Sequence, residues 1–161
     1  ATYDSVMYLL QKGHEKIGIL GGPLSSNTNQ ERYNAYCDAF KDSGLVPSPD
    51  LIKFPRQPQN FHIPNLFQEL IDQNCSSIVI GGSRMALECS NRIIHNFSHV
   101  EFVITIDSPE YKNLFSDFSA IELPTEQMGR MVGRQMLQRI QNRDSRICEQ
   151  ILNASFNPRN A

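Results

Sequence analysis

The chain has 161 residues, with 15 lysines and arginines against 17 aspartates and glutamates, so its formal net charge is −2. This length suits one domain around a single core, and the slightly acidic balance argues against a strongly basic nucleic-acid surface in this segment. No apolar run approaches the roughly 18 residues of a membrane helix, and no charged-then-apolar leader begins the chain. We therefore expect a cytoplasmic protein with no membrane contact.

The cysteines and histidines give no sign of a metal centre or of a disulfide framework. The four cysteines lack C-x-x-C spacing, and Cys37, Cys75 and Cys89 fall in or beside predicted helices. We expect them to be small, reduced side chains. The four histidines show no paired ligand spacing, so we expect no bound metal and no cofactor.

Apolar patterning predicts alternating helices and strands as far as Asp107. In chain order the predicted elements are a helix ending at Gly13, a strand at 17–20, a helix from 29 to the Ser43-Gly44 pair, a strand at 51–54, a helix at 63–74, a strand at 77–80, a helix at 85–96 and a strand at 102–106. Strands that alternate with helices over short connections are typical of an α/β fold, an open parallel sheet with helices on both faces.

The pattern changes after Asp107. A long loop leads to residues 120–124, and a helix is predicted over 126–141. The alternating apolar residues of 147–156 could form a last strand.

The ends of the predicted strands carry the candidate binding residues. Carboxyl ends of parallel strands meet at one edge of an open sheet, so the loops after Gly21, Ile80 and Ile106 should lie together. Arg32, near the start of the second helix, offers a planar fork of donors to hydroxyls, a carboxylate or the edge of a base. Asp107 could accept hydrogen bonds from a polyol or an amine. Each also has a plainer interpretation, Arg32 as a solvated helix residue and Asp107 as a helix cap or loop residue.

No group of residues points to catalysis. His14 is not accompanied by a serine or cysteine in a nucleophile motif, and it fits a structural histidine that closes the turn between the first helix and the first strand. The Gly21-Gly22 and Gly81-Gly82 pairs are not followed by Gly-Lys-Ser/Thr, so they are not phosphate loops. We therefore predict no catalytic residues, and a binding protein rather than an enzyme.

A long motif surrounds the first strand: Gly13-His14-Glu15-Lys16-Ile17-Gly18-Ile19-Leu20-Gly21-Gly22-Pro23-Leu24-Ser25-Ser26, followed by Arg32-Tyr33-Asn34-Ala35-Tyr36. It resembles the effector-sensing domain of the LacI/GalR family of bacterial transcription regulators. Further stretches resemble the same domain, at 79–86, 102–107, 121–132 and 157–161. The resemblance covers nearly the whole chain and implies the fold of a type I periplasmic-binding-protein-like subdomain.

The resemblance also divides the chain. It implies that residues 1–122 are the C-terminal subdomain, that 123–146 hold a crossover helix normally packed in the N-terminal subdomain, and that 147–161 are a terminal strand and tail. The chain opens on Ala1 inside an apparent helix, so we expect a fragment without the helix-turn-helix DNA reader. Operator DNA would be contacted only through that absent N-terminal part. The crossover helix would lack its usual cover, which predicts self-association or exchange of this helix between chains.

The resemblance implies one set of effector-binding residues. They are Arg32, Asp107, Ser25, Asn27, Thr28, Asn29, Gly82, Ser83 and Phe61. Gly82 and Ser83 stand where the family usually has an asparagine and an aspartate, which removes an amide that usually bonds the effector. Some residues of the 25–29 loop would face the ligand and at least one would cap the following helix. Phe61 is either an apolar wall or an ordinary core residue.

The resemblance further implies a homodimer, with Leu87, Ile94 and Phe115 as apolar points of its interface. The alternative is that these side chains face the sheet. The function implied is the ligand-sensing and dimerisation part of a LacI-type DNA-binding regulator. A small, sugar-like effector would shift the closure of two subdomains and thereby DNA binding. The alternative is a sugar-binding receptor of an ABC transport system, which shares the fold.

Overall fold

The computed structural model of the chain describes residues 1–55, 62–96, 98–142 and 149–159. The strands of this part are β1 (Ile17–Leu20), β2 (Ile52–Lys53), β3 (Ser77–Ile80), β4 (Glu101–Ile106), β5 (Ser119–Glu122) and β6 (Ser155–Asn157). The helices are α1 (Thr2–Gln11), α2 (Asn27–Asp42), α3 (Ile63–Asp72), α4 (Ser83–Glu88), α5 (Ser90–Asn96) and α6 (Thr125–Gln141), with short 3-10 turns at Pro49–Leu51 and Pro109–Tyr111.

The strands form one six-stranded sheet in the order β2-β1-β3-β4-β5-β6. The pairs from β2 to β5 are parallel, and only β6 runs antiparallel, against β5. Leu20 at the end of β1 lies opposite Ile80 at the end of β3. The loops that follow β1 and β3 therefore open at one edge of the sheet. The predicted open α/β sheet is confirmed, with one antiparallel edge strand added.

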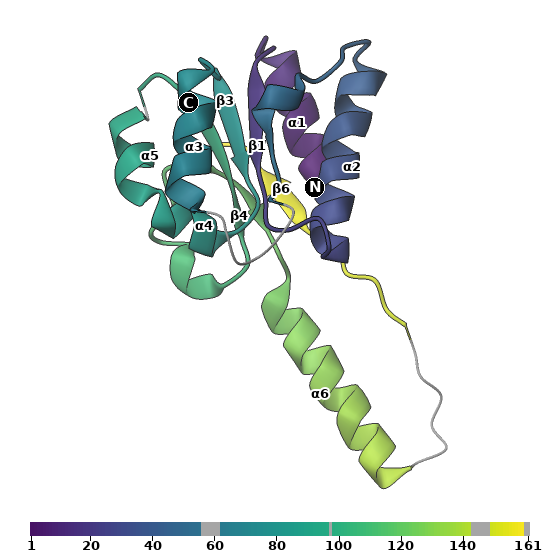
Figure 1. The fold of residues 1–161 in the computed structure, drawn as a ribbon. Coiled ribbons are helices and arrows are strands. Elements are labelled where there is room, and N and C mark those ends of the chain that lie inside the picture. Colours follow the sequence, from purple (N-terminus) through teal and green to yellow (C-terminus); the bar gives the residue numbers. More distant parts are fainter. Residues whose placement is uncertain (56–61, 97, 143–148, 160–161) are drawn as a thin grey trace.

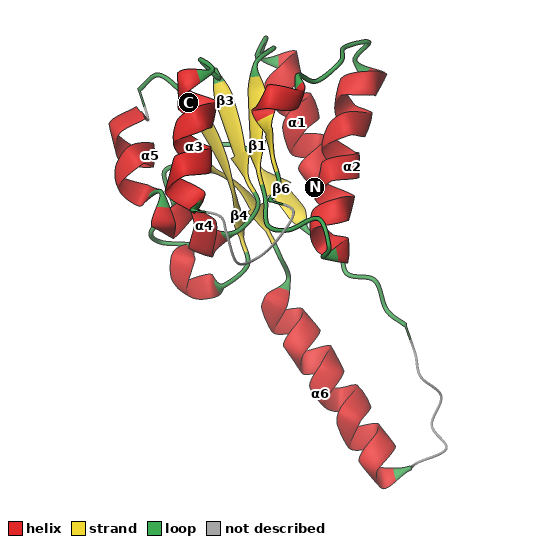
Figure 2. Ribbon diagram, viewed as in Figure 1, coloured by secondary structure: helices red, strands yellow, loops and turns green. Residues whose placement is uncertain are grey.

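Helices cover both faces of the sheet (Figure 2). On one face, Ile19 and Val79 pack with α1 and α2. On the other face, Ile78 and Ile80 pack with α3, α4 and α5. Successive strand residues point to opposite faces, so strands buried on both sides need the continuous apolar runs seen in the sequence. The buried Tyr36 hydroxyl of α2 donates a hydrogen bond of 2.7 Å to the Ile17 carbonyl oxygen of β1, which joins helix and strand.

Two expectations about the elements need correction. The helix predicted over 85–96 is two helices, α4 and α5, and the break falls at Cys89, whose N–H is shared between the Met85 and Ala86 carbonyl oxygens at 3.2 Å each. Shared bonds of this kind are common at helix ends. Neither glycine nor proline marks the break, so the apolar pattern gave no signal for it. The last strand is only Ser155–Asn157, and β5 lies in a stretch for which no strand was predicted.

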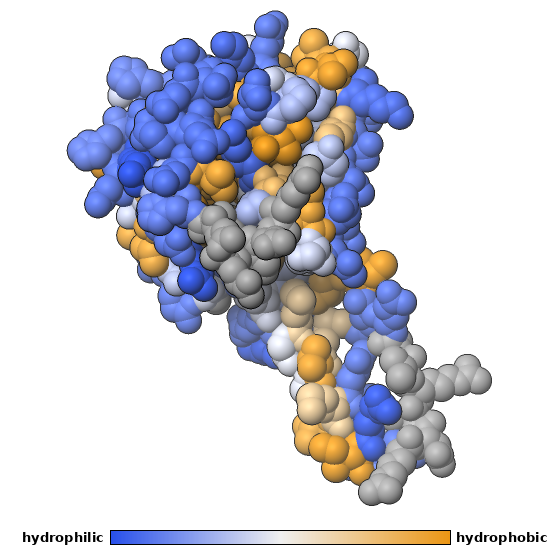
Figure 3. Space-filling model, in the orientation of Figure 1, coloured by the Kyte–Doolittle hydropathy of each residue, from blue (hydrophilic) through white to orange (hydrophobic). Residues whose placement is uncertain are grey.

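Helix α6 projects away from the sheet (Figure 1) and contains no buried residue. Its exposed apolar side chains are Met128, Val132, Met136, Leu137 and Ile140, and the apolar colour along this helix is plain in Figure 3. An exposed apolar face of this kind is typical of interaction surfaces. No helix of the described residues is long and apolar enough to cross a membrane.

Candidate functional site

A cleft of about 440 Å³ lies at the carboxyl edge of the sheet. The described residues that line it come from the loops after β1, β3 and β4, from α2 and α4, and from the start of α3: Gly22, Pro23, Asn29, Arg32, Ile63, Gly81, Gly82, Arg84, Met85, Glu88 and Asp107. Of the effector residues implied by the resemblance, the structure thus brings Arg32, Asp107, Asn29 and Gly82 together. An open α/β sheet binds ligands at this edge.

Arg32 is fixed in the cleft by its neighbour one helical turn earlier. Its Nη1 donates to Asn29 Oδ1 at 3.1 Å, and Asn29 Nδ2 donates to the Pro23 carbonyl oxygen at 3.0 Å. Asn29 is 8% exposed, and it fits there because Gly22 has no side chain, since a Cβ on Gly22 would lie 2.7 Å from Asn29 Nδ2. Asn29 is therefore a positioning residue, and its amide is already committed to the protein.

Arg32 and Asp107 face each other across the cleft without forming an ion pair. Burial lowers the pKa of Arg32, while the Asp107 carboxylate acts in the opposite direction, so the two charges interact. Guanidinium remains charged near neutral pH even so. No guanidinium nitrogen of Arg32 lies within 4.0 Å of a carboxylate oxygen of Asp107 among the described residues. The gap between them leaves donors on one side and an acceptor on the other.

The charges of the described cleft residues balance. Arg32 and Arg84 are opposed by Glu88 and Asp107, and Arg84 Nε donates to Glu88 Oε1 at 3.1 Å. The Asp107 carboxylate would repel a strongly anionic ligand, and the Arg32 guanidinium would repel a strongly cationic one. The electrostatics favour a neutral or zwitterionic polar ligand.

Ser83 lies beside the cleft but does not open into it. Its side chain is fully buried. Its hydroxyl donates to the Thr105 carbonyl oxygen and accepts from the Asp107 N–H, each at 3.2 Å. The expectation that Ser83 contacts the ligand is therefore wrong for its side chain, because both hydrogen-bonding roles are used within the protein. Ser83 instead holds the start of α4 against the end of β4.

The polar segment at the start of α2 lies largely outside the cleft. Ser25, Asn27 and Thr28 are exposed and do not line it. Ser26 occupies the N-cap position of α2, but no side-chain cap bond forms there, so the expected capping by a side chain is wrong. The backbone N–H of Asn29 instead bonds the Ser26 carbonyl oxygen at 3.0 Å. Phe61 falls outside the described residues.

The three residues expected at a dimer interface divide into two groups. Leu87 and Ile94 are 42% and 67% exposed, so their side chains are free to meet a partner. Phe115 is only 4% exposed and belongs to the core beside α3, α4 and α5, with its ring 6.2 Å from that of Phe118. Its placement at an interface is therefore wrong, and the alternative of core packing applies.

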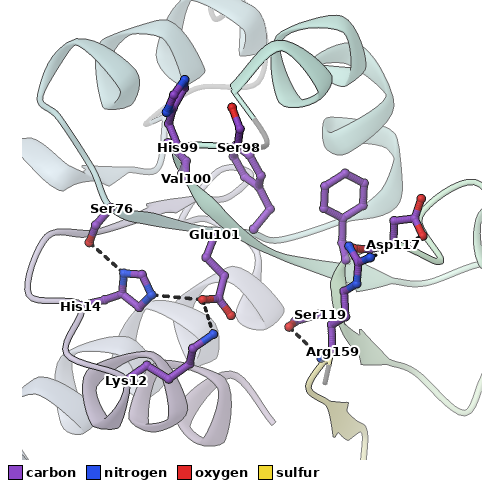
Figure 4. A pocket seen from close by; sticks show the side chains of 12 residues that line it. Lys12, His14, Ser76, Ser98, His99, Val100, Glu101, Asp117, Ser119 and Arg159 are labelled. Atoms are coloured by element: carbon purple, nitrogen blue, oxygen red, sulfur yellow. Dashed lines mark hydrogen bonds and ion pairs between the residues drawn. The ribbon is translucent and has the colours of Figure 1, made fainter. Parts of the chain in front are cut away.

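A second cavity, of about 470 Å³, lies at the opposite edge of the sheet (Figure 4). There Lys12 Nζ and His14 Nε2 both contact Glu101 Oε2, at 2.6 and 3.1 Å, and His14 Nδ1 contacts Ser76 Oγ at 3.0 Å. These contacts tie the segments that precede β1 and β3 to the first residue of β4, which supports the interpretation of His14 as a structural residue. No sequence signal linked Lys12 to Glu101. The described residues include no group of three or more His, Cys, Asp or Glu that could hold a metal ion.

The fold and the cleft together define a binding domain of open α/β type. A model of the family described as periplasmic binding proteins and sugar binding domain of LacI family matches residues 1–158. The chain therefore belongs to this family, as the sequence resemblance implied. The prediction of a binding protein rather than an enzyme agrees with this membership.

Individual relatives are distant. The chain is 25% identical over 152 residues to the HTH-type transcriptional repressor PurR of Klebsiella pneumoniae, an alignment that covers 88% of this chain and 43% of that protein. It spans less than half the length of that curated relative. Among solved structures, a putative transcription regulator from Staphylococcus saprophyticus superposes with a TM-score of 0.82 at 19% identity, covering 99% of this chain and 61% of that one. The transcriptional regulator CelR–cellobiose complex superposes with a TM-score of 0.79 at 20% identity, covering 96% and 49%.

Proposed function

We propose that the chain is the ligand-sensing and dimerisation part of a cytoplasmic LacI-type transcriptional regulator. The observation that carries this proposal is the opposed pair of Arg32 and Asp107 in the cleft at the carboxyl edge of the sheet. The named repressors among its relatives favour a regulator over the alternative, a sugar-binding receptor of an ABC transport system.

The ligand is a small polyol, such as a sugar. Vicinal hydroxyls accept from the planar guanidinium of Arg32 with their oxygens and donate to the Asp107 carboxylate with their hydrogens. A neutral polyol also suits the described cleft residues because their positive and negative charges balance. Because the protein group in each such hydrogen bond is charged, the bond is stronger than one between two neutral groups.

The cleft is half of the whole binding site in this proposal. Residues 1–122 form one subdomain, 123–146 form a crossover helix that packs in a second subdomain, and 147–161 form a terminal strand and tail. The exposed apolar face of α6 supports this division, since a partner surface would cover it. Ligand held between two subdomains changes their closure only by its difference in affinity for the open and closed states.

The dimer and DNA belong to the same proposal. Leu87 on α4 and Ile94 on α5 lie on a surface that a second copy would cover. Closure of the subdomains would change the geometry of that dimer, and operator DNA would respond through a DNA-binding domain outside this chain.

The binding test uses the full-length gene product, which would supply the second half of the site, and a panel of sugars that includes cellobiose, with chemical shifts of the backbone amides as the readout. We expect saturable shifts around Gly82 and Asp107. Arg32→Ala should weaken binding about tenfold or more, because it removes charge-assisted bonds. Arg130→Ala, which removes an exposed arginine of α6, is the matched control. Binding that is indifferent to Arg32→Ala would contradict the proposed site.

A second measurement separates the regulator from the transport receptor. In the full-length gene product, a ligand that binds this cleft should change the retention of operator-containing DNA in a gel-shift assay. Retention of no DNA under any ligand condition, together with sugar uptake that depends on the gene, would favour the receptor instead.

A further inference from the structure

The cavity at the amino edge of the sheet has the size of a small-ligand site. Its volume of about 470 Å³ lies in the range in which proteins bind small molecules. Its described lining residues precede or begin β1, β3, β4 and β5, or follow β6. It therefore shares no described residue with the cleft that holds Arg32 and Asp107. The contacts of His14 account for one wall of this cavity and leave the rest of its lining without a role.

The middle of the cavity is apolar. Val100 and Phe102 are buried and Phe118 is half-buried, and all three line the cavity. The rings of Phe102 and Phe118 lie edge to face with their centroids 6.1 Å apart. Apolar surface with a few polar groups around it is the usual lining of a ligand pocket. This part of the cavity suits an apolar group of a ligand.

One wall of the cavity carries a carboxylate with unused acceptor capacity. Lys12 and His14 both contact the same oxygen of Glu101, Oε2, at 2.6 and 3.1 Å. A carboxylate has two oxygens and about four acceptor sites, so Oε1 can accept from a ligand. The Glu101 side chain is 22% exposed. Figure 4 shows Lys12 and His14 on one side of this carboxylate and Arg159 on the other.

The facing wall carries a guanidinium. The Arg159 N–H donates to Ser119 Oγ at 3.0 Å, and its Nη1 donates to the Asp117 carbonyl oxygen. These bonds fix the backbone and the side chain of Arg159 beside the start of β5. The Asp117 carboxylate points away from Glu101 (Figure 4), and Asp117 Oδ1 lies 4.0 Å from Arg159 Nη2. A guanidinium at the cavity attracts an anion and matches the geometry of a carboxylate.

The separation of the two walls sets the length of a ligand that joins them. Glu101 begins β4 and Arg159 follows β6, with β5 between these strands. Neighbouring strands lie about 4.8 Å apart, so two such steps span about 10 Å. An extended chain covers about 3.3–3.6 Å per residue, so a tripeptide also spans about 10 Å. Its ammonium and carboxylate ends would each reach a protein group of opposite charge.

We propose that the cavity at the amino edge of the sheet binds a short extended peptide with free termini, of about the length of a tripeptide. The peptide ammonium donates to Glu101 Oε1, and the peptide carboxylate accepts from the Arg159 guanidinium. The apolar side chain of the middle residue lies against Val100 and Phe118. The site is separate from the proposed sugar-binding cleft, so the two assignments stand or fall independently.

The test changes the peptide before it changes the protein. The probe is the tripeptide Ala-Leu-Ala, titrated into the full-length gene product with backbone amide shifts as the readout. Saturable shifts are expected around Glu101 and Ser119. N-acetylation removes the ammonium and C-terminal amidation removes the carboxylate. Each should weaken binding about tenfold, because each removes a charge-assisted hydrogen bond. This comparison needs no protein variant, so it does not depend on how a variant folds.

Protein variants then assign each peptide end to its wall. Glu101→Gln and Arg159→Gln should each weaken the free tripeptide about tenfold. Glu101→Gln should change the affinity of the acetylated peptide less than about twofold, since the ammonium that it would lose is already gone. Arg159→Gln should have equally little effect on the amidated peptide. Glu31→Gln and Lys41→Gln, at exposed positions of α2, are the matched controls and should bind as the unsubstituted protein does.

Three results overturn the proposal. The first is the absence of any tripeptide-induced shift around Glu101 and Ser119. The second is equal affinity for the free and the capped peptides, which shows that the termini are not recognised. The third is loss of tripeptide binding in Arg32→Ala, which places the peptide in the cleft at the opposite edge of the sheet.

Discussion

His14 and Glu101 are 87 positions apart in the sequence, yet His14 Nε2 lies 3.1 Å from Glu101 Oε2. Lys12 reaches the same oxygen at 2.6 Å, and His14 also contacts Ser76. One imidazole thus connects the segments that lead into β1 and β3 with the first residue of β4. The edge of the sheet opposite the cleft is held together by side chains rather than by loops alone.

This network predicts that His14→Ala destabilises the fold. The substitution removes two partly buried side-chain contacts and leaves Ser76 and Glu101 without one partner each. The expected loss is about 1–2 kcal/mol in the free energy of unfolding, measured by urea denaturation. His95→Ala, at an exposed position of α5, should change stability by less than about 0.5 kcal/mol. Equal stability of the two variants would contradict the role given to His14.

We predict that Asn29 supports ligand binding without contacting the ligand, because its side chain holds Arg32 in position. Asn29→Ala leaves Arg32 in place but removes the acceptor that orients its guanidinium. We expect ligand affinity to fall about tenfold, because a freed arginine must be ordered again on binding. Titration of amide shifts with the sugar panel measures this, with the exposed Asn34→Ala as control. Undiminished affinity in Asn29→Ala would show that Arg32 needs no such support.

The buried cysteines predict a reactivity order and a pH dependence. Burial raises the pKa of Cys75 to about 11 and that of Cys89 to about 12, whereas Cys37 is only half-buried. Because the thiolate is the nucleophile, iodoacetamide at pH 8 should modify Cys37 well before Cys75 and Cys89, as followed by peptide mass spectrometry. Fast labelling of Cys75 in the native chain would contradict this burial.

The same shifts set the sign of a stability change at alkaline pH. A thiol whose folded pKa is raised binds its proton more tightly in the folded state. Its contribution to stability is complete below the unfolded value of about 9 and is lost as pH rises through the folded values of about 11 and 12. The urea concentration at the midpoint of unfolding should therefore decrease as the pH is raised from 9 to 11. Cys89→Ala should lessen this fall.

Helix α6 predicts concentration-dependent association of the isolated chain. Met136 and Leu137 are each 60% exposed and Ile140 is 74% exposed. We expect sedimentation velocity to show larger particles as concentration rises, and Met136→Lys with Ile140→Lys to shift the chain toward the monomer. Gln138→Lys with Gln141→Lys is the control, since this pair adds the same two charges at exposed polar positions of α6. A strictly monomeric, compact particle at high concentration would rule out compensation by self-association.

Much of the fold was predictable because its signals are local. The strands at 17–20 and 77–80 and the helix over 126–141 follow from continuous apolar runs and helical spacing, and the structure has them within a residue. The alternation in Ser119–Glu122 covers only four residues beside a long loop, and β6 is shorter still. Neither segment forms a strand without the other elements, so their pairing could not be seen in a local pattern.

The candidate site was predictable at the level of sheet edges and not at the level of side-chain direction. Strand order places Arg32 and Asp107 at one edge, and the structure has them lining one cleft. Whether Ser83 faces ligand or protein depends on Thr105, which lies 22 positions away and accepts its hydrogen bond. Asn29 likewise gained its role from Pro23 and Arg32. The role of Ser83 was decided by a contact between residues distant in sequence, and that of Asn29 by side-chain directions within one loop and one helical turn.

The pairing of Glu122 with Ser155 has an architectural consequence. The chain leaves the sheet after β5 and returns in register at the same point, so residues 123–154 form an excursion with both ends anchored on adjacent antiparallel strands. Such strands need only a two-residue turn to be joined. An Asn-Gly turn between Leu123 and Ala154 should close a hairpin and leave the remaining sheet intact. The excursion that carries α6 is therefore an insertion between two adjacent strands, and recombination could lengthen, replace or remove it without changing the residues of the core.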